Sequence, residues 1–167
     1  PLGVIFDSVT GQPLDGVRIS IIEDDTGLPA KVYGDDGTST YPSTLITGQS
    51  VTDSSGVVYE MPAGSYRFPL LSPGHYHFEV VPPVNYRFPS VRDDVALQSL
   101  PNGPFAIRAG SRGERFRLRA SPPLRIDLPL DPAGDGGLYL LKTASAERAG
   151  HGDFIRYELS LENVGKI

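Results

Sequence analysis

Apolar and polar residues alternate in several short segments of the chain. In the segment 17–21, three apolar residues on one side alternate with two polar residues on the other. The same alternation occurs over 76–80, 115–120 and 124–130. A period of two is typical of a strand that buries one face and exposes the other. The pattern therefore predicts an all-β fold of antiparallel sheets, arranged as a sandwich or a barrel.

Glycine and proline separate these segments at close spacing. The 167 residues include 19 glycines and 16 prolines, so few windows are long enough for a helix. Asp-Gly, Asn-Gly and Pro-Gly pairs mark turns between the predicted strands. Two polar stretches, 25–50 and 88–113, are too long for plain hairpin loops, and we expect extra small strands or ordered excursions there.

A change in composition divides the chain near its C-terminal end. The segment 132–137 contains three glycines and a proline among its six residues and is the best candidate for a linker. We therefore expect a first domain over 1–131, and two further strands within 138–167. Because an isolated hairpin is marginally stable in water, these strands either begin a second domain or pack on the first domain or on another chain.

Composition and charge exclude several classes of function. The formal net charge of −5 argues against nucleic acid as an obligatory partner, since such binding usually needs a basic surface. No apolar run reaches the ~18–20 residues of a membrane span. With no cysteine there are no disulfides, thiol nucleophiles or Cys-ligated zinc sites. No G-x-S-x-G motif and no glycine-rich phosphate loop is present, so we expect no enzyme.

The sequence His75-x-His77-x-Glu79 is a candidate metal site. Strand geometry places these three side chains on one face, and two imidazoles with one carboxylate suit Zn²⁺ or a similar metal. Residues on one strand face lie ~6.5–7 Å apart, however, so a shared metal requires further convergence. The alternative interpretation is a solvated strand face.

Acidic residues in the predicted turns are candidate calcium ligands. Carboxylate and backbone oxygens are the ligands that Ca²⁺ prefers. The alternative interpretation is that these side chains cap backbone amides within their own turns. The residues concerned are Asp24, Asp25, Asp35, Asp36 and Asp53.

Five arginines form a local basic stripe in an otherwise acidic chain. Such a stripe fits an anionic glycan, a lipid headgroup or the acidic loops of a neighbouring module. It also fits an edge strand whose charges prevent edge-to-edge aggregation. The residues are Arg108, Arg112, Arg115, Arg117 and Arg119.

The N-terminal part of the chain resembles the carboxypeptidase-regulatory-like modules. The residues that carry this resemblance are 3–17, 51–56, 66–68, 71–76 and 82–86. The B-type repeats of bacterial surface adhesins share the same pattern. The resemblance implies a transthyretin-like (prealbumin-like) Greek-key β-sandwich of about seven strands, here with loop extensions. Because such adhesin repeats often bind calcium in their loops, the resemblance also implies calcium binding by the loops of this chain.

The C-terminal residues resemble the start of a second family. They are similar to the opening of a conserved repeat in large bacterial surface proteins, the domain of unknown function known as type eleven. The residues that carry this similarity are 141–144, 152–153, 157 and 163–165. This resemblance implies the leading strands of a second, Ig-like β-sandwich. An isopeptide bond of the kind found in adhesin repeats stays open only for Lys142 and Asn163, since the first strand contains no lysine.

Together these patterns predict a non-enzymatic structural or spacer module of a secreted or bacterial cell-surface protein. Its expected partners are neighbouring β-modules of the same chain or adjacent copies, with no membrane insertion by this segment. One alternative is an adhesion module that binds a glycan or surface protein through loops near 35–56 and 98–113. Others are an accessory domain of a metallopeptidase and a filament subunit that assembles by strand addition.

Overall fold

The computed structural model of the chain describes residues 1–133, 138–144, 154 and 156–163. It consists of two compact units, Pro1–Pro132 (the N-terminal unit) and Ala133–Ile167 (the C-terminal unit). In chain order the elements are β1 (Leu2–Asp7), β2 (Arg18–Glu23), β3 (Leu28–Pro29), β4 (Val32–Tyr33), β5 (Thr40–Tyr41), β6 (Thr44–Ile46), β7 (Val51–Thr52), β8 (Val58–Tyr59), β9 (Ser65–Arg67), β10 (Gly74–Val81), β11 (Tyr86–Arg87), α1 (Asp94–Gln98), β12 (Phe116–Leu118), β13 (Leu128–Pro132), β14 (Leu138–Ala144) and β15 (Tyr157–Asn163).

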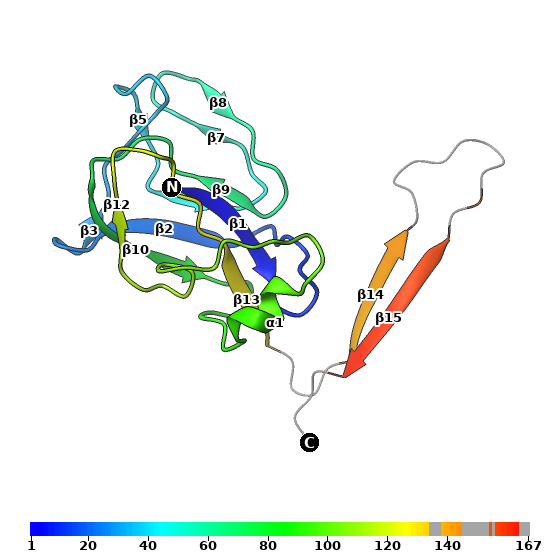
Figure 1. Cartoon of the computed structure of the whole chain (residues 1–167). Coiled ribbons are helices and arrows are strands. Elements are labelled where there is room, and N and C mark those ends of the chain that lie inside the picture. The colour runs from blue at the N-terminus through cyan, green and yellow to red at the C-terminus, as the bar shows by residue number, and fades with distance from the viewer. Residues whose placement is uncertain (134–137, 145–153, 155, 164–167) are drawn as a thin grey trace. The chain divides into compact units, whose positions relative to one another are not determined.

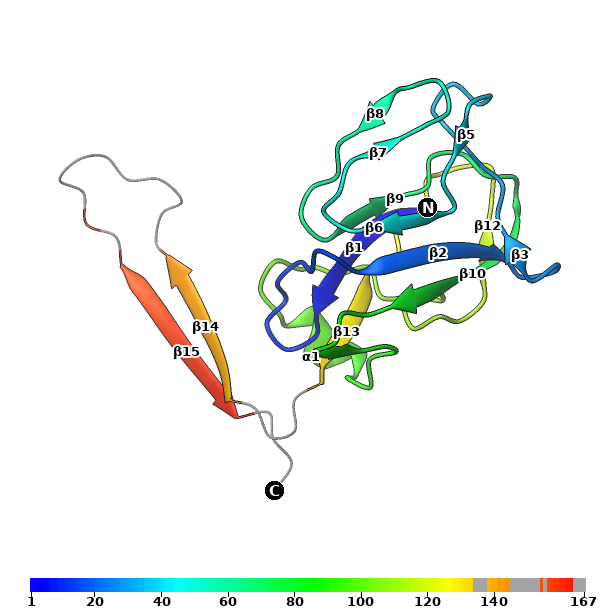
Figure 2. The same ribbon diagram turned by 180° about the vertical axis from the view of Figure 1, so that it is seen from behind.

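The N-terminal unit contains two main sheets (Figure 1). One has the strand order β11-β13-β1-β9, and the other has the order β12-β10-β2-β3. Strand β6 also pairs with β2, beside which it lies in Figure 2. Strands β4 and β5 form one small hairpin, and β7 and β8 form another. The prediction of an all-β fold is confirmed.

Both sheets contribute side chains to one hydrophobic core. Ile19 and Ile21 of β2 are fully buried, as are Ile5 of β1 and Leu128 of β13. Phe78 of β10 is 2% exposed and contacts aromatic rings from both sheets. The apolar sides of 17–21 and 76–80 thus face inward, as predicted, and so do Phe116 and Leu118, whereas Ala120 is exposed. Over 124–130 the prediction of one wet face is wrong, since Asp127 and Pro129 are buried as well as their apolar neighbours. Each large side chain buried in this way contributes about 1.5–3 kcal/mol relative to exposure.

The first and last strands of the N-terminal unit pair in parallel. Ile5 lies opposite Leu128 and Asp7 lies opposite Leu130, although the paired residues are 123 positions apart in the chain. Backbone hydrogen bonds extend this pairing from the Leu2 amide to the Ser8 amide. The β1–β13 pairing therefore closes the unit.

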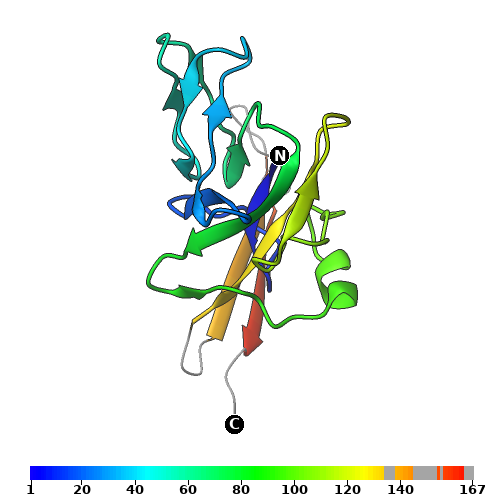
Figure 3. The same cartoon turned by 90° about the vertical axis from the view of Figure 1, so that its left-hand side faces the viewer.

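The polar stretch 88–113 is an ordered excursion that contains α1, as Figure 3 shows to one side of the strands. The Asp93 carboxylate caps α1 by accepting a hydrogen bond from the Ala96 amide at 2.8 Å. Leu97 and Phe105 pack against Phe6 in a second small core, in which the rings of Phe6 and Phe105 stack with centroids 3.6 Å apart. The predicted order in this stretch is confirmed.

The C-terminal unit contains the antiparallel pair β14–β15. Seven residue pairs run from Leu138–Asn163 to Ala144–Tyr157. Lys142 lies opposite Leu159, so its backbone is about 13 Å along the ladder from that of Asn163, and the register does not bring this pair opposite each other. Of the predicted linker 132–137, residues 134–137 lie outside the described residues. No helix within the described part of the chain has the length and apolar character needed to cross a membrane.

The second small core generates the first prediction. Replacing Phe105 by Ala removes the ring stacked on Phe6 and leaves a cavity beneath the excursion, so we expect the free energy of unfolding to fall by about 3 kcal/mol. Urea denaturation measures this change. The matched control is Val95→Ala at an exposed position of α1. We expect it to change the free energy of unfolding by less than about 0.5 kcal/mol. Equal effects of the two substitutions would contradict a packing role for Phe105.

Candidate functional site

The two histidines of β10 lie beside the acidic turn that follows β2. The His77 Nδ1 atom is 3.0 Å from Asp24 Oδ1, and the His75 Nδ1 atom is 4.0 Å from Asp25 Oδ2. The turn lies at this position because β2 and β10 pair in antiparallel register up to Glu23 and Tyr76. The structure therefore brings together two predicted zinc ligands and two predicted calcium ligands.

An arginine contacts the oxygen of each of these carboxylates that the histidines do not approach. The Arg115 Nε atom lies 3.0 Å from Asp24 Oδ2, and its terminal nitrogen lies 2.9 Å from Asp25 Oδ1. Arg115 immediately precedes β12, the edge strand next to β10. This cluster of two aspartates, two histidines and one arginine joins the β2–β3 turn, β10 and the start of β12. Because its members are partly exposed, each ion pair contributes at most about 1 kcal/mol.

Glu79 is not part of this cluster. It lies two positions beyond His77 on β10, opposite Ser20 of β2, and it is exposed. Among the residues that the structure describes, no group of three or more His, Asp or Glu side chains is arranged to hold a metal ion. The zinc and calcium sites therefore remain predictions, and the structure gives the hydrogen-bond partner of several of their residues.

Asp36 and Asp53 each hold a turn in the region of the small hairpins. The Asp36 carboxylate accepts hydrogen bonds from the Ser39 hydroxyl and from two backbone amides, which hold its pKa well below its usual range. The Asp53 carboxylate accepts hydrogen bonds from the Ser55 hydroxyl, from the Ser55 and Val57 amides, and from the Tyr59 hydroxyl at 3.1 Å. These contacts, led by the Ser55 hydroxyl, lower the pKa of Asp53.

Asp35 extends the same network to β9. Its carboxylate accepts a hydrogen bond from Arg67, whose guanidinium carbon lies 5.9 Å from the centre of the Tyr59 ring. The Tyr59 hydroxyl in turn accepts a hydrogen bond from the Asp35 amide at 3.0 Å. Tyr41 packs edge-on against Tyr59, and its buried hydroxyl is the one buried side-chain polar atom of the described residues without a hydrogen-bond partner. Burial raises the pKa of Tyr41.

The five arginines of the predicted stripe have different environments. Arg112 donates hydrogen bonds to the Ser90 and Arg92 carbonyl oxygens and forms an ion pair with Asp94, so it fixes the excursion. Arg115 belongs to the cluster described above. Arg108, Arg117 and Arg119 are exposed. The stripe is therefore not one uniform binding surface.

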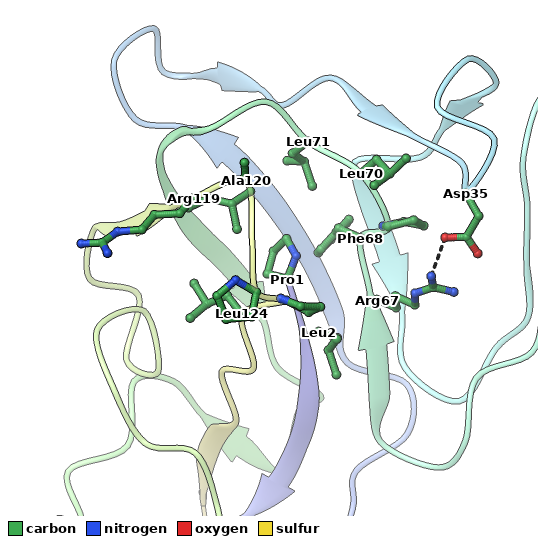
Figure 4. Close-up of a pocket in the computed structure, with 14 residues that line it drawn as sticks. Pro1, Leu2, Asp35, Arg67, Phe68, Leu70, Leu71, Arg119, Ala120 and Leu124 are labelled. Atoms are coloured by element: carbon green, nitrogen blue, oxygen red, sulfur yellow. Dashed lines mark hydrogen bonds and ion pairs between the residues drawn. The ribbon is translucent and has the colours of Figure 1, made fainter.

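A cavity of about 260 Å³ lies where β1 begins (Figure 4). Its walls come from the segments after β9 and β12, and Leu2, Phe68, Leu71 and Leu124 supply much of the apolar lining. The Arg67–Asp35 ion pair lies on one side, whereas the guanidinium of Arg119 points away from the cavity in Figure 4. Because the lining comes from segments distant in the chain, no local motif indicates this cavity.

Comparison of the chain with protein-family models, with curated proteins and with solved structures finds no match. The resemblance to carboxypeptidase-regulatory-like modules and to a bacterial surface-protein repeat therefore stays a prediction.

The lowered pKa of Asp53 generates a prediction about pH. Since its pKa is lower in the folded chain than the ~3.9 of an unfolded aspartate, Asp53 stabilises the fold above about pH 4, and this contribution is lost as pH falls further. We expect Asp53→Asn to destabilise the protein at pH 7 and the difference from wild type to shrink by pH 3. Urea denaturation at both pH values tests this. An unchanged difference would show that Asp53 does not contribute through its charge.

Proposed function

We propose that this chain is a non-enzymatic structural module of a large multi-domain bacterial cell-surface or secreted protein. In this proposal the N-terminal unit is a transthyretin-like Greek-key β-sandwich, and β14 and β15 are leading strands of an Ig-like sandwich repeat. The two sheets around one core and the sequence resemblance support this assignment.

The observation that carries the proposal is how two aspartates, the fully buried Asp127 and the partly buried Asp131, are used. The Asp127 carboxylate accepts hydrogen bonds from the amides of Val4 and Ala106, which belong to different segments of the N-terminal unit. The Asp131 carboxylate accepts hydrogen bonds from two serine hydroxyls and from the Val91 amide. Charges that are costly to bury are thus used to hold loops to strands. This use favours a rigid module over a reaction centre.

The proposed location can be tested on cells that produce the full-length protein. We expect an antibody raised against residues 1–132 to label intact cells, and externally added protease to remove the label, because the module lies outside the cytoplasm. A cytoplasmic protein of the same cells serves as the control for intact membranes. Signal found only after the cells are broken open would contradict the proposed location.

A second candidate function is binding of a glycan or a surface protein, and the cavity is the observation that favours it. Asp35, in one of the loops predicted to bind, lies on the cavity wall. If the cavity is the contact, Leu71→Trp fills it and should weaken any saturable binding seen on a glycan array or in a pull-down at least about tenfold. Val91→Trp, on an exposed loop position outside the cavity, is the control and should leave binding unchanged. Equal binding by both variants would exclude the cavity as the contact.

A further inference from the structure

The parallel pairing of β1 with β13 determines how the N-terminal unit responds to tension along the chain. Tension enters this unit at the start of β1 and leaves it at the end of β13. Because the strands run in the same direction, these two points lie at opposite ends of the pair, and the strands are pulled past each other lengthwise. The load is then shared by all hydrogen bonds across the pair, which must yield together.

The bonds that share this load are spread along the whole overlap. The Leu2 amide donates to the Leu124 carbonyl oxygen at 3.0 Å, and the Leu2 carbonyl oxygen accepts from the Ile126 amide at 2.9 Å. At the other end, the Ser8 amide donates to the Leu130 carbonyl oxygen at 2.9 Å.

Two carboxylates, the buried Asp127 and the partly buried Asp131, add side-chain links across the same pair. Asp127 is fully buried and accepts a hydrogen bond from the Val4 amide at 2.9 Å, while Arg125 forms an ion pair with it at 3.0 Å. Asp131 accepts a hydrogen bond from the Ser8 hydroxyl. Bonds to a carboxylate are stronger than those between neutral groups, and they are strongest where water is excluded.

The β14–β15 pair is loaded in the opposite way. Its chain enters at Leu138 and leaves at Asn163, and these residues lie opposite each other at one end of the antiparallel ladder. Tension therefore pulls the two strands apart sideways and breaks one residue pair at a time. Tyr157, Leu159 and Leu161 are each more than half exposed, so little buried apolar area opposes the opening.

We propose that the N-terminal unit is a load-bearing element and that the β14–β15 hairpin is a weak element in series with it, which opens first. The proposal rests on the proposed function, since a structural module of a surface protein is one that bears tension. The function proposed for the N-terminal unit is resistance to lengthwise pulling, which follows from the geometry of the β1–β13 pair.

The test is force spectroscopy on the whole chain. Since the chain contains no cysteine, one added at each terminus gives unique attachment points. We expect a low-force extension of roughly 90 Å as residues 138–163 straighten, followed at higher force by one of roughly 450 Å from the N-terminal unit. A single extension event, or the reverse order, would overturn the proposal.

A second pulling direction supplies the matched control in the same fold. Cysteines at the exposed positions Ser72 and Ala120 lie near one end of the antiparallel β10–β12 pair, where Gly74 lies opposite Leu118. Pulling there opens that pair sideways, and we expect the unfolding force to be lower by about a factor of two. Equal or higher force in this direction would refute the role of the β1–β13 pair.

Two substitutions separate resistance to force from equilibrium stability. Asp127→Asn weakens the links across β1 and β13, and we expect it to lower the unfolding force for pulling at the termini. Leu118→Ala removes buried surface outside this pair, and we expect it to lower the free energy of unfolding while leaving that force unchanged. If Asp127→Asn does not fold, the comparison of the unfolding forces in the two pulling directions still tests the role of the β1–β13 pair. Surface labelling tests the cellular location independently, so either proposal can fail alone.

Discussion

The N-terminal unit depends on a pairing between the two ends of its chain. Strands β1 and β13 are neighbours in one sheet although more than a hundred residues separate them. Closing a loop of that length costs conformational entropy. Contacts between the first strand and residues near the end of the unit offset this cost. Those contacts are the fully buried Ile5, Leu128 and Leu130 together with the carboxylate of Asp127. Strand β11 pairs with β13, and the excursion packs Leu97 and Phe105 on Phe6 of β1, so both depend on contacts with this strand pair.

Two aspartates, one fully buried and one partly buried, solve a problem that the loops of this fold create. A long excursion contains backbone amides that no strand satisfies, and an unsatisfied buried amide costs about 1–3 kcal/mol. A carboxylate buried without partners costs more. Placing the fully buried Asp127 against the amides of Val4 and Ala106 removes both costs at once, and the partly buried Asp131 holds the excursion through the amide of the exposed Val91. The polar residues of the interior are therefore part of the architecture.

The sequence predicts the local features of this fold well and the distant ones poorly. Alternation over 17–21 and 76–80 predicts which faces of β2 and β10 are buried, because the period of a strand is a local property. Turn residues and the length of 88–113 predict the ordered excursion. The parallel β1–β13 pairing has no local signal, since it joins residues from opposite ends of the unit. Asp127 is likewise one acidic residue among apolar neighbours, and nothing in its own segment indicates the amides that it binds.

The same contrast explains the candidate sites and the mechanical proposal. The His75-x-His77 pattern predicts that the two imidazoles share one strand face with Glu79, whereas the carboxylates that lie beside them belong to Asp24 and Asp25 of another strand's turn, and Arg115 is bound to both. A pattern on one strand cannot show what the adjacent strand contributes. Resistance to tension is also a property of strand pairs. Because the chain contains no cysteine, no disulfide can lock its ends, and the direction of the load relative to β1–β13 and β14–β15 determines which pair yields.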